Sequence, residues 1–546
     1  MTPVACTVCT SADAQVLLRG EVSNADELRS ELGLRPDESL QAVLLAAWQR
    51  WSIDSFAKLN GGFALTVRNA NELFLYRDPS GLQGLFYAGL PGGRVAFATE
   101  LAQLPSDGAD RPRWARQSLH EYLRFLDISA PNTMRGDAHA VEPGQVVHCS
   151  PRAIAKWLVP PSATGEPEPP DFAEAVSRLD LELSRAVAMQ LRDVARPAAF
   201  LSGGIDSSLI CAMAARQRPD LTMLTVGFDG ARFDEAPIAQ KVAASIGAAH
   251  QVLRFGRQDY LSAFERLSGR MDQPMADPAT MATVLAFDHC REHFDGVLDG
   301  TGADEAVGAM PPRHVRLAVG YASLLPAGLR RALVRAMSAV PGLAGYTPIL
   351  DFEHPADTMI RWKGFTRTEI EELCGEPVSF GHTQFYRTFA RFPRHAHYER
   401  YSALLNAMPI ERLTQAALIS GVRVRCPFSE RDTDAFIRQL RTDWRYLPGQ
   451  PKRILRALLA RYVPREIWDV PKHGFDFPLH EFLAGDDFAL VQRYVNHGRW
   501  LDTQLLRADV VRRYGRQYMA GDRRLMFRVW ALVVLGAWLE KHDELT

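Results

Sequence analysis

Short apolar runs separated by turn residues occupy much of the first part of the chain. This pattern predicts short strands at 63–67, 73–76, 85–88 and 95–98. Two segments with helical spacing, 25–32 and 40–51, predict helices beside them. We therefore expect the first part of the chain to be a sheet-rich domain with a few helices.

A second pattern begins near residue 172, with a predicted helix over 172–192. On a later helix Ile238, Val242 and Ile246 share one face, and Gly247 gives a stop signal. Strands that alternate with helices are typical of a parallel sheet covered on both faces. From about residue 313 the chain is predicted to be mostly helical. The alternating elements are strands at 198–201, 221–226, 251–255 and 296–298 and helices at 207–216 and 236–246.

A proline-rich segment separates the two patterns. Residues 157–171 hold five prolines and one glycine. Proline is disfavoured inside helices and central strands, so this segment is predicted to be an extended linker. The chain is thereby divided into a first domain over 1–156 and a second domain over 172–546.

Composition and charge narrow the class of protein. Hydrophobic residues make up 47% of the chain, and 63 Lys and Arg balance 64 Asp and Glu to a net charge of -1. This composition is typical of a globular protein, and it provides no basic excess for nucleic acid as a main partner. Seven sparse cysteines favour a reducing compartment, and the single CxxC of Cys6 and Cys9 indicates redox or metal chemistry only weakly.

Two terminal features bear on location. No secretory signal is evident at the start of the chain. The longest late apolar run, 529–539, is too short to span a bilayer and is predicted to be a buried helix. We therefore expect a cytoplasmic protein without a membrane span.

The most informative segment is FLSGGIDSS at 200–208, which leaves a predicted strand and enters a predicted helix. Its glycines let backbone N–H groups approach a phosphate, its serines can donate hydrogen bonds, and a helix N-terminus adds positive charge. No Gly-Lys-Ser/Thr follows, which excludes a Walker A loop. The alternative is a glycine turn that only caps the helix. The predicted nucleotide contacts are Leu201, Ser202, Gly203, Gly204, Asp206, Ser207 and Ser208.

A second acidic segment, VLDGTGADE at 297–305, follows another predicted strand. The carboxyl ends of parallel strands open onto one crevice, so Asp304 is expected near Asp206 and Gly300 near the nucleotide. Aspartates in an anion site are explained by a divalent cation, and we predict that both carboxylates bind Mg²⁺ with ATP. Helix capping by Asp304 is the alternative.

The two segments together resemble the asparagine synthetase B family, and further motifs follow in the family's order over nearly the whole chain. The resemblance implies α/β architecture: a glutaminase-like αββα domain of the N-terminal-nucleophile type, then a parallel-sheet ATP-pyrophosphatase domain of the adenine nucleotide α-hydrolase type. It implies that Val226 contacts adenine. It also implies that Lys472 stabilises charge in the transition states, with Lys452 as the alternative and Asp304 beside them. The further motifs are VGF at 226–228, FDE at 233–235, QPMADP at 273–278, RCPF at 425–428, KRILR at 452–456 and PKHGF at 471–475.

The first domain resembles the family's glutaminase domain but departs at its catalytic residues. The family needs an N-terminal Cys nucleophile, where Met1 and Thr2 stand here, and the oxyanion-hole Asn before its Gly-Glu is Arg19. The chain also has only 18 residues before Arg19, fewer than the family carries. We therefore expect a degenerate domain that serves as a scaffold or docking surface and hydrolyses no glutamine. The resemblance rests on GEVSN at 20–24, LNGGFA at 59–64, RDPSGL at 77–82 and Pro143-Gly144.

Without ammonia from glutamine, the nucleophile must come from another source. Two branches of the family use an amine of the substrate itself. β-Lactam synthetases close a small ring, and lasso peptide cyclases join a side-chain carboxyl of a peptide to its N-terminal amine. At the position of Thr301, asparagine synthetases carry Glu and β-lactam synthetases carry Tyr. Threonine is a poor acid or base near pH 7, so elimination favours the lasso branch.

The resulting hypothesis is a synthetase that uses ATP and Mg²⁺ to adenylate a side-chain carboxylate and close a macrolactam in a precursor or core peptide, releasing AMP and pyrophosphate. A leader peptidase and a leader-peptide-binding protein are further expected partners. The alternatives are a β-lactam synthetase-like or other small-molecule amide synthetase, and an ATP-binding scaffold without activity. The Arg-rich amphipathic segment 313–339 is either a solvated helical face or part of a lid or peptide groove.

Overall fold

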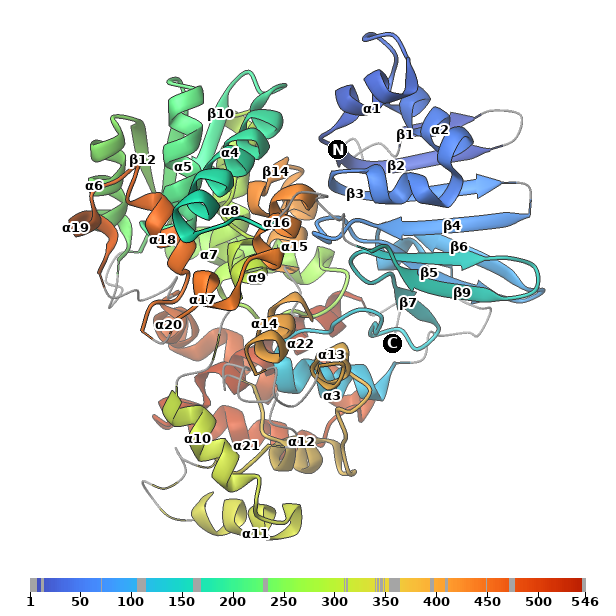
Figure 1. Cartoon of the computed structure of the whole chain (residues 1–546). Helices are drawn as coiled ribbons and strands as arrows, with labels where there is room; N and C mark the ends of the chain where they lie inside the picture. Colours follow the sequence, from blue (N-terminus) through green and yellow to red (C-terminus); the bar gives the residue numbers. More distant parts are fainter. Residues whose placement is uncertain are drawn as a thin grey trace.

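The structure is a computed structural model. It describes residues 7–10, 14–69, 71–105, 114–160, 168–228, 234–308, 310, 313–338, 340, 343, 347, 349–352, 364–392, 397–407, 411–447, 449–470 and 477–542. Figure 1 shows a sheet-rich domain beside a second domain built on a separate sheet, with a group of helices below both.

Two packed sheets form the first domain. Its elements are β1 (Thr7–Thr10), β2 (Gln15–Val22), α1 (Ala25–Leu32), α2 (Leu40–Trp51), η1 (Ser52–Lys58), β3 (Gly61–Asn69), β4 (Glu72–Arg77), β5 (Phe86–Leu90), β6 (Arg94–Ala98), η2 (Leu101–Gln103), α3 (Arg116–Phe125), β7 (Ala138–Ala140), β8 (Gln145–Cys149) and β9 (Ile154–Leu158). The strands are ordered β1-β2-β3-β4-β8-β9 in one sheet and β6-β5-β7 in the other.

The packing of this domain follows the alternation of its strands. Leu75 and Val147 of the larger sheet meet Leu85 and Tyr87 in one buried cluster between the sheets. The other face of the larger sheet is covered by α1 and α2, which bury Leu28, Val43, Leu44 and Trp48. The predicted helices are confirmed residue for residue, and the four predicted strands correspond to β3, β4, β5 and β6. β2 is not predicted, because its second half is the polar sequence Arg19-Gly20-Glu21.

The second domain holds the remaining elements. They are α4 (Phe172–Leu191), β10 (Pro197–Phe200), α5 (Ile205–Gln217), β11 (Thr222–Gly227), α6 (Ala236–Ile246), β12 (Ala249–Arg254), α7 (Arg257–Arg270), α8 (Ala279–His293), β13 (Gly296–Leu298), α9 (Ala303–Val307), α10 (Arg313–Ala322), α11 (Ala327–Ser338), α12 (Arg367–Cys374), α13 (Gln384–Ala390), α14 (His397–Ala407), α15 (Glu411–Ser420), β14 (Val424–Arg425), η5 (Pro427–Ser429), α16 (Arg431–Gln439), α17 (Thr442–Arg445), α18 (Arg453–Leu459), α19 (Arg465–Trp468), α20 (Leu479–Val491), η6 (Gln492–Asn496), η7 (Arg499–Thr503), α21 (Ala508–Met519), η8 (Arg523–Leu525) and α22 (Met526–Lys541).

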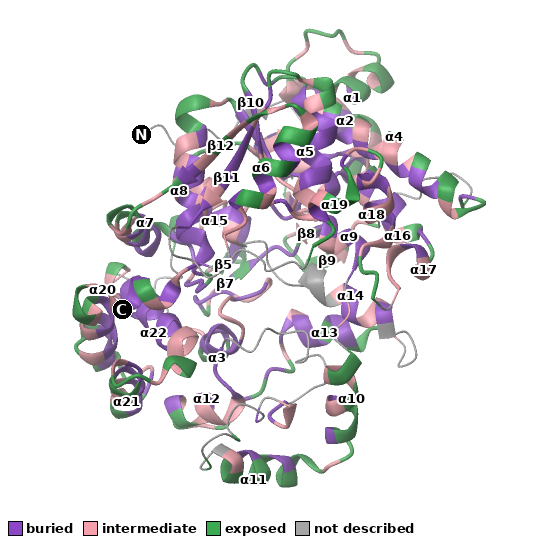
Figure 2. Ribbon diagram, turned by 90° about the vertical axis from the view of Figure 1, so that its left-hand side faces the viewer, coloured by how far each residue is buried: buried purple, intermediate pink, exposed green. Residues whose placement is uncertain are grey.

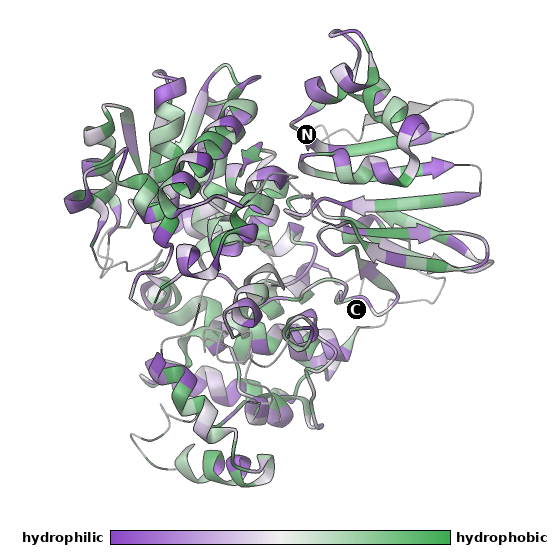
Figure 3. Cartoon of the chain, in the orientation of Figure 1, coloured by the Kyte–Doolittle hydropathy of each residue, from purple (hydrophilic) through white to green (hydrophobic). Residues whose placement is uncertain are grey.

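The centre of the second domain is a parallel sheet, as predicted. Its order is β12-β11-β10-β13-β14, and every neighbouring pair is parallel. Successive residues face opposite sides: Ala198 and Leu224 join one buried cluster, whereas Ala199 and Met223 join the other. Helices cover both faces, so the three middle strands β11, β10 and β13 are mostly buried (Figure 2) and mostly hydrophobic (Figure 3), whereas the edge strand β12 is largely exposed.

The C-terminal helix α22 is a buried core helix. All eleven residues from Val529 to Leu539 are buried. The indole N–H groups of Trp530 and Trp538 donate to the carbonyls of Ala276 and Met271, at 3.1 and 2.9 Å. No helix in the described ranges is long and apolar enough to cross a membrane.

Helix α3 belongs to the first domain in sequence but packs on the second. The Tyr122 hydroxyl donates to the Ala531 carbonyl of α22 at 2.8 Å, and the Phe365 N–H donates to the Leu123 carbonyl at 2.9 Å. The predicted linker begins within β9, which extends to Leu158, and it ends at Asp171, whose side chain caps α4. Residues 161–167 of that segment lie outside the described residues.

The burial of α22 predicts a large loss of stability on truncation of its side chains. Leu535→Ala removes a fully buried side chain, and we expect it to cost about 2–5 kcal/mol because the cavity cannot fully collapse. Leu181→Ala on α4 is the matched control, since Leu181 is 68% exposed and its loss should change stability by no more than about 0.5 kcal/mol. Urea unfolding of both variants tests this. Equal midpoints would contradict the buried assignment.

Candidate functional site

The candidate site lies where the strand order of the parallel sheet reverses. β10 is the first strand of this sheet in the chain, and it lies between the second strand, β11, and the fourth, β13. The loops that leave β10 and β13 therefore diverge to opposite faces and leave a crevice at their carboxyl ends. These two loops are the segments 201–204 and 299–302, which the sequence analysis selected.

The loop after β10 is tightly organised around two serines. The hydroxyl groups of Ser202 and Ser207 share a hydrogen bond of 2.9 Å, and the backbone N–H of Ser202 donates to Ser207 Oγ at 3.1 Å. Gly203 has a φ of +74°, and a Cβ there would lie 2.7 Å from Ile238 Cγ2. Glycine is therefore required at this turn into α5, as the sequence analysis predicts.

The loop after β13 is packed directly against the first turn of α5, which continues the first loop. A Cβ on Gly300 would lie only 2.9 Å from the backbone nitrogen of Ser207 and 3.1 Å from the carbonyl carbon of Asp206. Gly302 has a φ of +100°, and a Cβ there would lie 2.4 Å from Ser429 Oγ. The two loops thus form one continuous surface rather than two separate turns.

Lys452 joins the two predicted metal ligands. Its Nζ lies 2.5 Å from Asp206 Oδ2 and 2.7 Å from Asp304 Oδ1. Burial by itself would lower the pKa of Lys452, but the two carboxylates outweigh it and raise the pKa well above its usual value. The side chain is therefore a fixed positive charge at the floor of the crevice. The sequence analysis ranks Lys452 only as an alternative catalytic residue and does not predict this contact.

The donor set fits a cation that arrives with a nucleotide. Across the residues that the structure describes, no cluster of three or more His, Cys, Asp or Glu could hold a metal ion. Mg²⁺ is often held by one or two carboxylates together with substrate phosphates and water. The Lys452 ammonium between Asp206 and Asp304 shows that this pair of carboxylates accommodates positive charge.

Other predicted residues are placed differently. Leu201 and Ser208 are buried, at 1% and 0% exposure, so neither reaches the surface of the crevice as Ser202, Gly204 and Ser207 do. Val226 lies half-buried near the end of β11. Lys472, together with the rest of segment 471–476, lies outside the described residues.

Thr301 is held by a residue that the sequence analysis does not select. Its hydroxyl donates to Asp299 Oδ1 at 2.5 Å, and its backbone N–H donates to the same oxygen at 2.8 Å. The nearby Glu305 is half-buried and accepts from the Gly302 N–H, and desolvation of its carboxylate raises its pKa to about 7. The segment 299–305 therefore carries three carboxylates in different environments.

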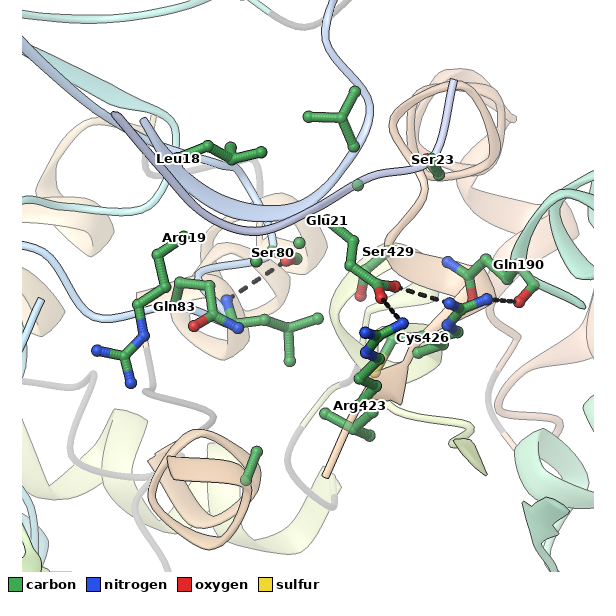
Figure 4. Close-up of a pocket in the computed structure, with 18 of the residues that line it drawn as sticks. Leu18, Arg19, Glu21, Ser23, Ser80, Gln83, Gln190, Arg423, Cys426 and Ser429 are labelled. Atoms are coloured by element: carbon green, nitrogen blue, oxygen red, sulfur yellow. Dashed lines mark hydrogen bonds and ion pairs between the residues drawn. The ribbon is translucent and has the colours of Figure 1, made fainter. Parts of the chain in front are cut away.

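A cavity of about 730 Å³ lies between the two domains (Figure 4). Arg19 lines it, is 8% exposed and forms an ion pair with Glu100 at 3.1 Å. Glu21 lines the same cavity and pairs with Arg423 and Arg425 of the second domain, at 3.2 and 2.9 Å. Both charged residues of the Arg19-Gly20-Glu21 segment thus form ion pairs, whereas the family resemblance implies an oxyanion-hole Asn at the position of Arg19. Thr2 lies outside the described residues.

The cavity borders the crevice at the carboxyl ends of β10 and β13. Cys426 and Ser429 line the cavity, and Ser429 is the residue against which Gly302 packs. A further side chain at this boundary, Glu430, accepts hydrogen bonds from Ser23 at 3.0 Å and from Gln190 at 2.5 Å. Burial raises the pKa of Glu430 to about 7. The two domains are therefore joined by buried polar contacts next to the loop that carries Asp304.

Comparison with known proteins finds two family models that match consecutive parts of the chain. The asparagine synthase family matches residues 178–540, and the glutamine amidotransferase domain matches residues 7–157. The chain is 23% identical to the glutamine-hydrolyzing asparagine synthetase 1 of Bacillus subtilis, over 96% of this chain and 85% of that protein. It is 26% identical to the carboxyethyl-arginine beta-lactam-synthase of Streptomyces clavuligerus, over 62% of this chain and 63% of that protein.

The close contact between Gly302 and Ser429 predicts that adding a methyl group at residue 302 weakens nucleotide binding in the crevice. Gly302→Ala places a Cβ against Ser429 in a backbone conformation that favours glycine, so we expect the loop to shift and ATP affinity to fall by about tenfold or more. Gly269→Ala on α7 is the matched control, because a Cβ there meets nothing within 4 Å. Calorimetric titration with ATP and Mg²⁺ tests both variants. Equal affinities would show that the two loops do not bind nucleotide together.

Proposed function

Because this chain belongs to the asparagine synthase family of ATP-dependent, amide-forming enzymes, we propose that it closes a macrolactam ring within a peptide substrate. A side-chain carboxylate of the peptide is adenylated, and the N-terminal amine of the same peptide displaces AMP. The observation that carries the first half of this proposal is the single surface formed by the two loops, with Asp206, Asp304 and Lys452 at its floor.

The first step is attack of the substrate carboxylate on the α-phosphorus of ATP. The hydroxyl groups of Ser202 and Ser207, with the N-terminus of α5, bind and orient the pyrophosphate that leaves. Asp206 and Asp304 would hold Mg²⁺, which when bound neutralises the charge of the phosphates. Lys452 holds both carboxylates at one point and adds its own positive charge beside them.

The second step is attack of the amine on the acyl carbon, with departure of AMP. Both reacting groups belong to one molecule, so holding them in the right orientation makes the step unimolecular. This can lower the activation barrier by as much as about 7–11 kcal/mol. Lys472 is our choice for stabilising the oxyanion of this step, as the family resemblance implies.

The changed first domain supports an amine that comes from the substrate. Arg19 replaces the oxyanion-hole Asn that the resemblance implies, and it pairs with Glu100. Glu21 of the same motif is bound to two arginines of the second domain. Such a site is poorly suited to hydrolyse glutamine, so the ammonia route of asparagine synthetases is closed in this proposal.

A second candidate function is a synthetase acting on a small molecule. The similarity to a carboxyethyl-arginine beta-lactam-synthase favours it, since that protein also belongs to an amide-forming group. Against it stands Thr301, at the position where β-lactam synthetases carry Tyr. The peptide substrate, a leader peptidase and a leader-peptide-binding protein remain the partners of the first proposal.

Ring closure can be measured directly. We expect the enzyme with ATP and Mg²⁺ to convert a peptide that has an N-terminal Gly and an Asp or Glu several residues later into a product lighter by one water. One AMP should form for each ring. The peptide product is measured by mass spectrometry and AMP by chromatography. Asp206→Asn is the matched control, because it keeps the size of the side chain while removing the charge beside Lys452. It should lower AMP formation by about 10² or more.

Two results would contradict this function. AMP formation with carboxyethyl-arginine but with none of the peptides would favour the small-molecule candidate. AMP formation by Asp206→Asn at the wild-type rate would remove the acidic pair from the reaction.

The first domain yields a separate prediction. Purified enzyme should release no glutamate from glutamine, with or without ATP, because Arg19 and Glu21 are both bound in ion pairs. Glutamate is measured with a coupled dehydrogenase assay, and a known amount of added glutamate serves as the control for detection. Release of glutamate above the uncatalysed rate would overturn the scaffold interpretation.

A further inference from the structure

The proposed ring closure leaves one chemical requirement without a residue. Near neutral pH the N-terminal amine of a peptide is largely protonated, since its usual pKa is about 7.7–8.0. It must lose two protons in becoming an amide nitrogen, and a base must accept them. The family resemblance implies Glu or Tyr at the position of Thr301, and a threonine hydroxyl cannot act as a base alone near pH 7.

The structure places a carboxylate one hydrogen bond away from that position. Thr301 Oγ1 lies 2.5 Å from Asp299 Oδ1, the hydroxyl donating, and the Thr301 N–H holds the same oxygen at 2.8 Å. A hydroxyl that already donates to a carboxylate has its lone pairs available to accept a proton from a third group. The pair is therefore arranged as a base with a relay.

The pair is also fixed at the crevice. The Asp299 N–H donates to the Arg425 carbonyl of β14 at 2.8 Å, which continues the strand pairing of β13. Gly300, between the two residues, lies against the backbone of Asp206 and Ser207. Both side chains are partly exposed. They therefore lie beside the loop proposed to bind the phosphates and are not enclosed in the core.

We propose that Asp299, acting through the hydroxyl of Thr301, is the proton acceptor for the attacking amine; this rests on the proposed function. In the step, the nitrogen lone pair forms the C–N bond, and the C–O bond to AMP breaks with its electron pair leaving on AMP. The amine loses two protons by the same route, one before the attack and one as the C–N bond forms: each moves to Thr301 Oγ1 as the hydroxyl proton moves to Asp299. Solvent takes each proton from Asp299 in turn, the first before the attack and the second before the next turnover.

Within the described part of the chain, two other titratable groups are close enough to interact electrostatically with Asp299, and neither competes for this role. They are the thiols of Cys211 on α5 and Cys426 after β14, both buried. Burial raises the pKa of each thiol well above its usual value, so both stay protonated and neutral near pH 7. Lys452 is held by Asp206 and Asp304 instead.

The competing explanation is that Asp299 only shapes the turn, because an aspartate that accepts from the N–H two residues on is a common turn former. Asparagine makes the same turn with its amide oxygen but accepts no proton. Asp299→Asn therefore separates the two explanations. Thr301→Ser keeps the hydroxyl relay, and Thr301→Val keeps the shape of the side chain without the hydroxyl.

The test measures the two half-reactions of the full-length enzyme separately. Adenylation is followed as ATP–pyrophosphate exchange that depends on the substrate, and amide formation is followed by mass spectrometry. The probes are a peptide with an N-terminal Gly and an internal Asp and, in parallel, aspartate with ammonium chloride. Asp299→Asn and Thr301→Val should keep exchange within about threefold of wild type and lower amide formation about 10²–10⁴-fold. Thr301→Ser should recover most of the amide formation that Thr301→Val loses, because it restores the hydroxyl relay.

The pH dependence gives a readout that a purely structural role would not change. The ratio of wild-type to Asp299→Asn rates should be largest near pH 6.5 and shrink above the pKa of the amine, where less of it needs a base. A constant ratio, wild-type amide formation by Asp299→Asn, or an equal loss of exchange would each overturn the assignment. If wild type exchanges pyrophosphate and forms asparagine but closes no ring, the proposed function fails while aspartate and ammonia still test Asp299.

Discussion

The backbone contact between two loops is the constraint on which the rest of the site depends. Gly300 approaches Asp206 and Ser207 so closely that even a methyl group would collide with them. This contact is possible because β10 and β13 are neighbours in the sheet although about a hundred residues of chain separate them. It brings two acidic loops into one crevice, where their like charges would repel each other. Lys452 offsets that repulsion with short contacts to both carboxylates.

The first domain contributes to this arrangement through its Arg19-Gly20-Glu21 segment. Glu21 binds Arg423 and Arg425, which flank and form the last strand of the parallel sheet. The same strand pairs with β13 and leads to Ser429, the residue that packs on Gly302. The segment that resembles a glutaminase motif thus helps to position the loop that leads to Asp304. In the proposed function, this contact gives the first domain a structural role that needs no glutamine hydrolysis.

The sequence predicts what local patterns determine. The helices α1, α2 and α6 and the loops after β10 and β13 follow from spacing, caps and glycines, and the structure confirms them. Long-range contacts are invisible to such patterns: Lys452 is 246 residues from Asp206, and its place between two carboxylates depends on the folded chain. The sequence does not predict β2, because half of this strand faces the polar cavity between the domains and therefore does not alternate between apolar and polar residues. The sequence predicts that Ser208 donates a hydrogen bond to a phosphate, but its side chain is buried in the first turn of α5.

The central claim is that the crevice activates a carboxylate by transferring AMP to it. The most direct measurement is a reaction with substrate whose side-chain carboxylate carries ¹⁸O on both oxygens. Attack of that carboxylate on the α-phosphorus leaves one labelled oxygen on phosphorus when the amide forms. The account predicts AMP that is heavier by one ¹⁸O and unlabelled pyrophosphate. Label in inorganic phosphate, or AMP without label, would contradict it, because the carboxylate would then have been activated in another way or not at all.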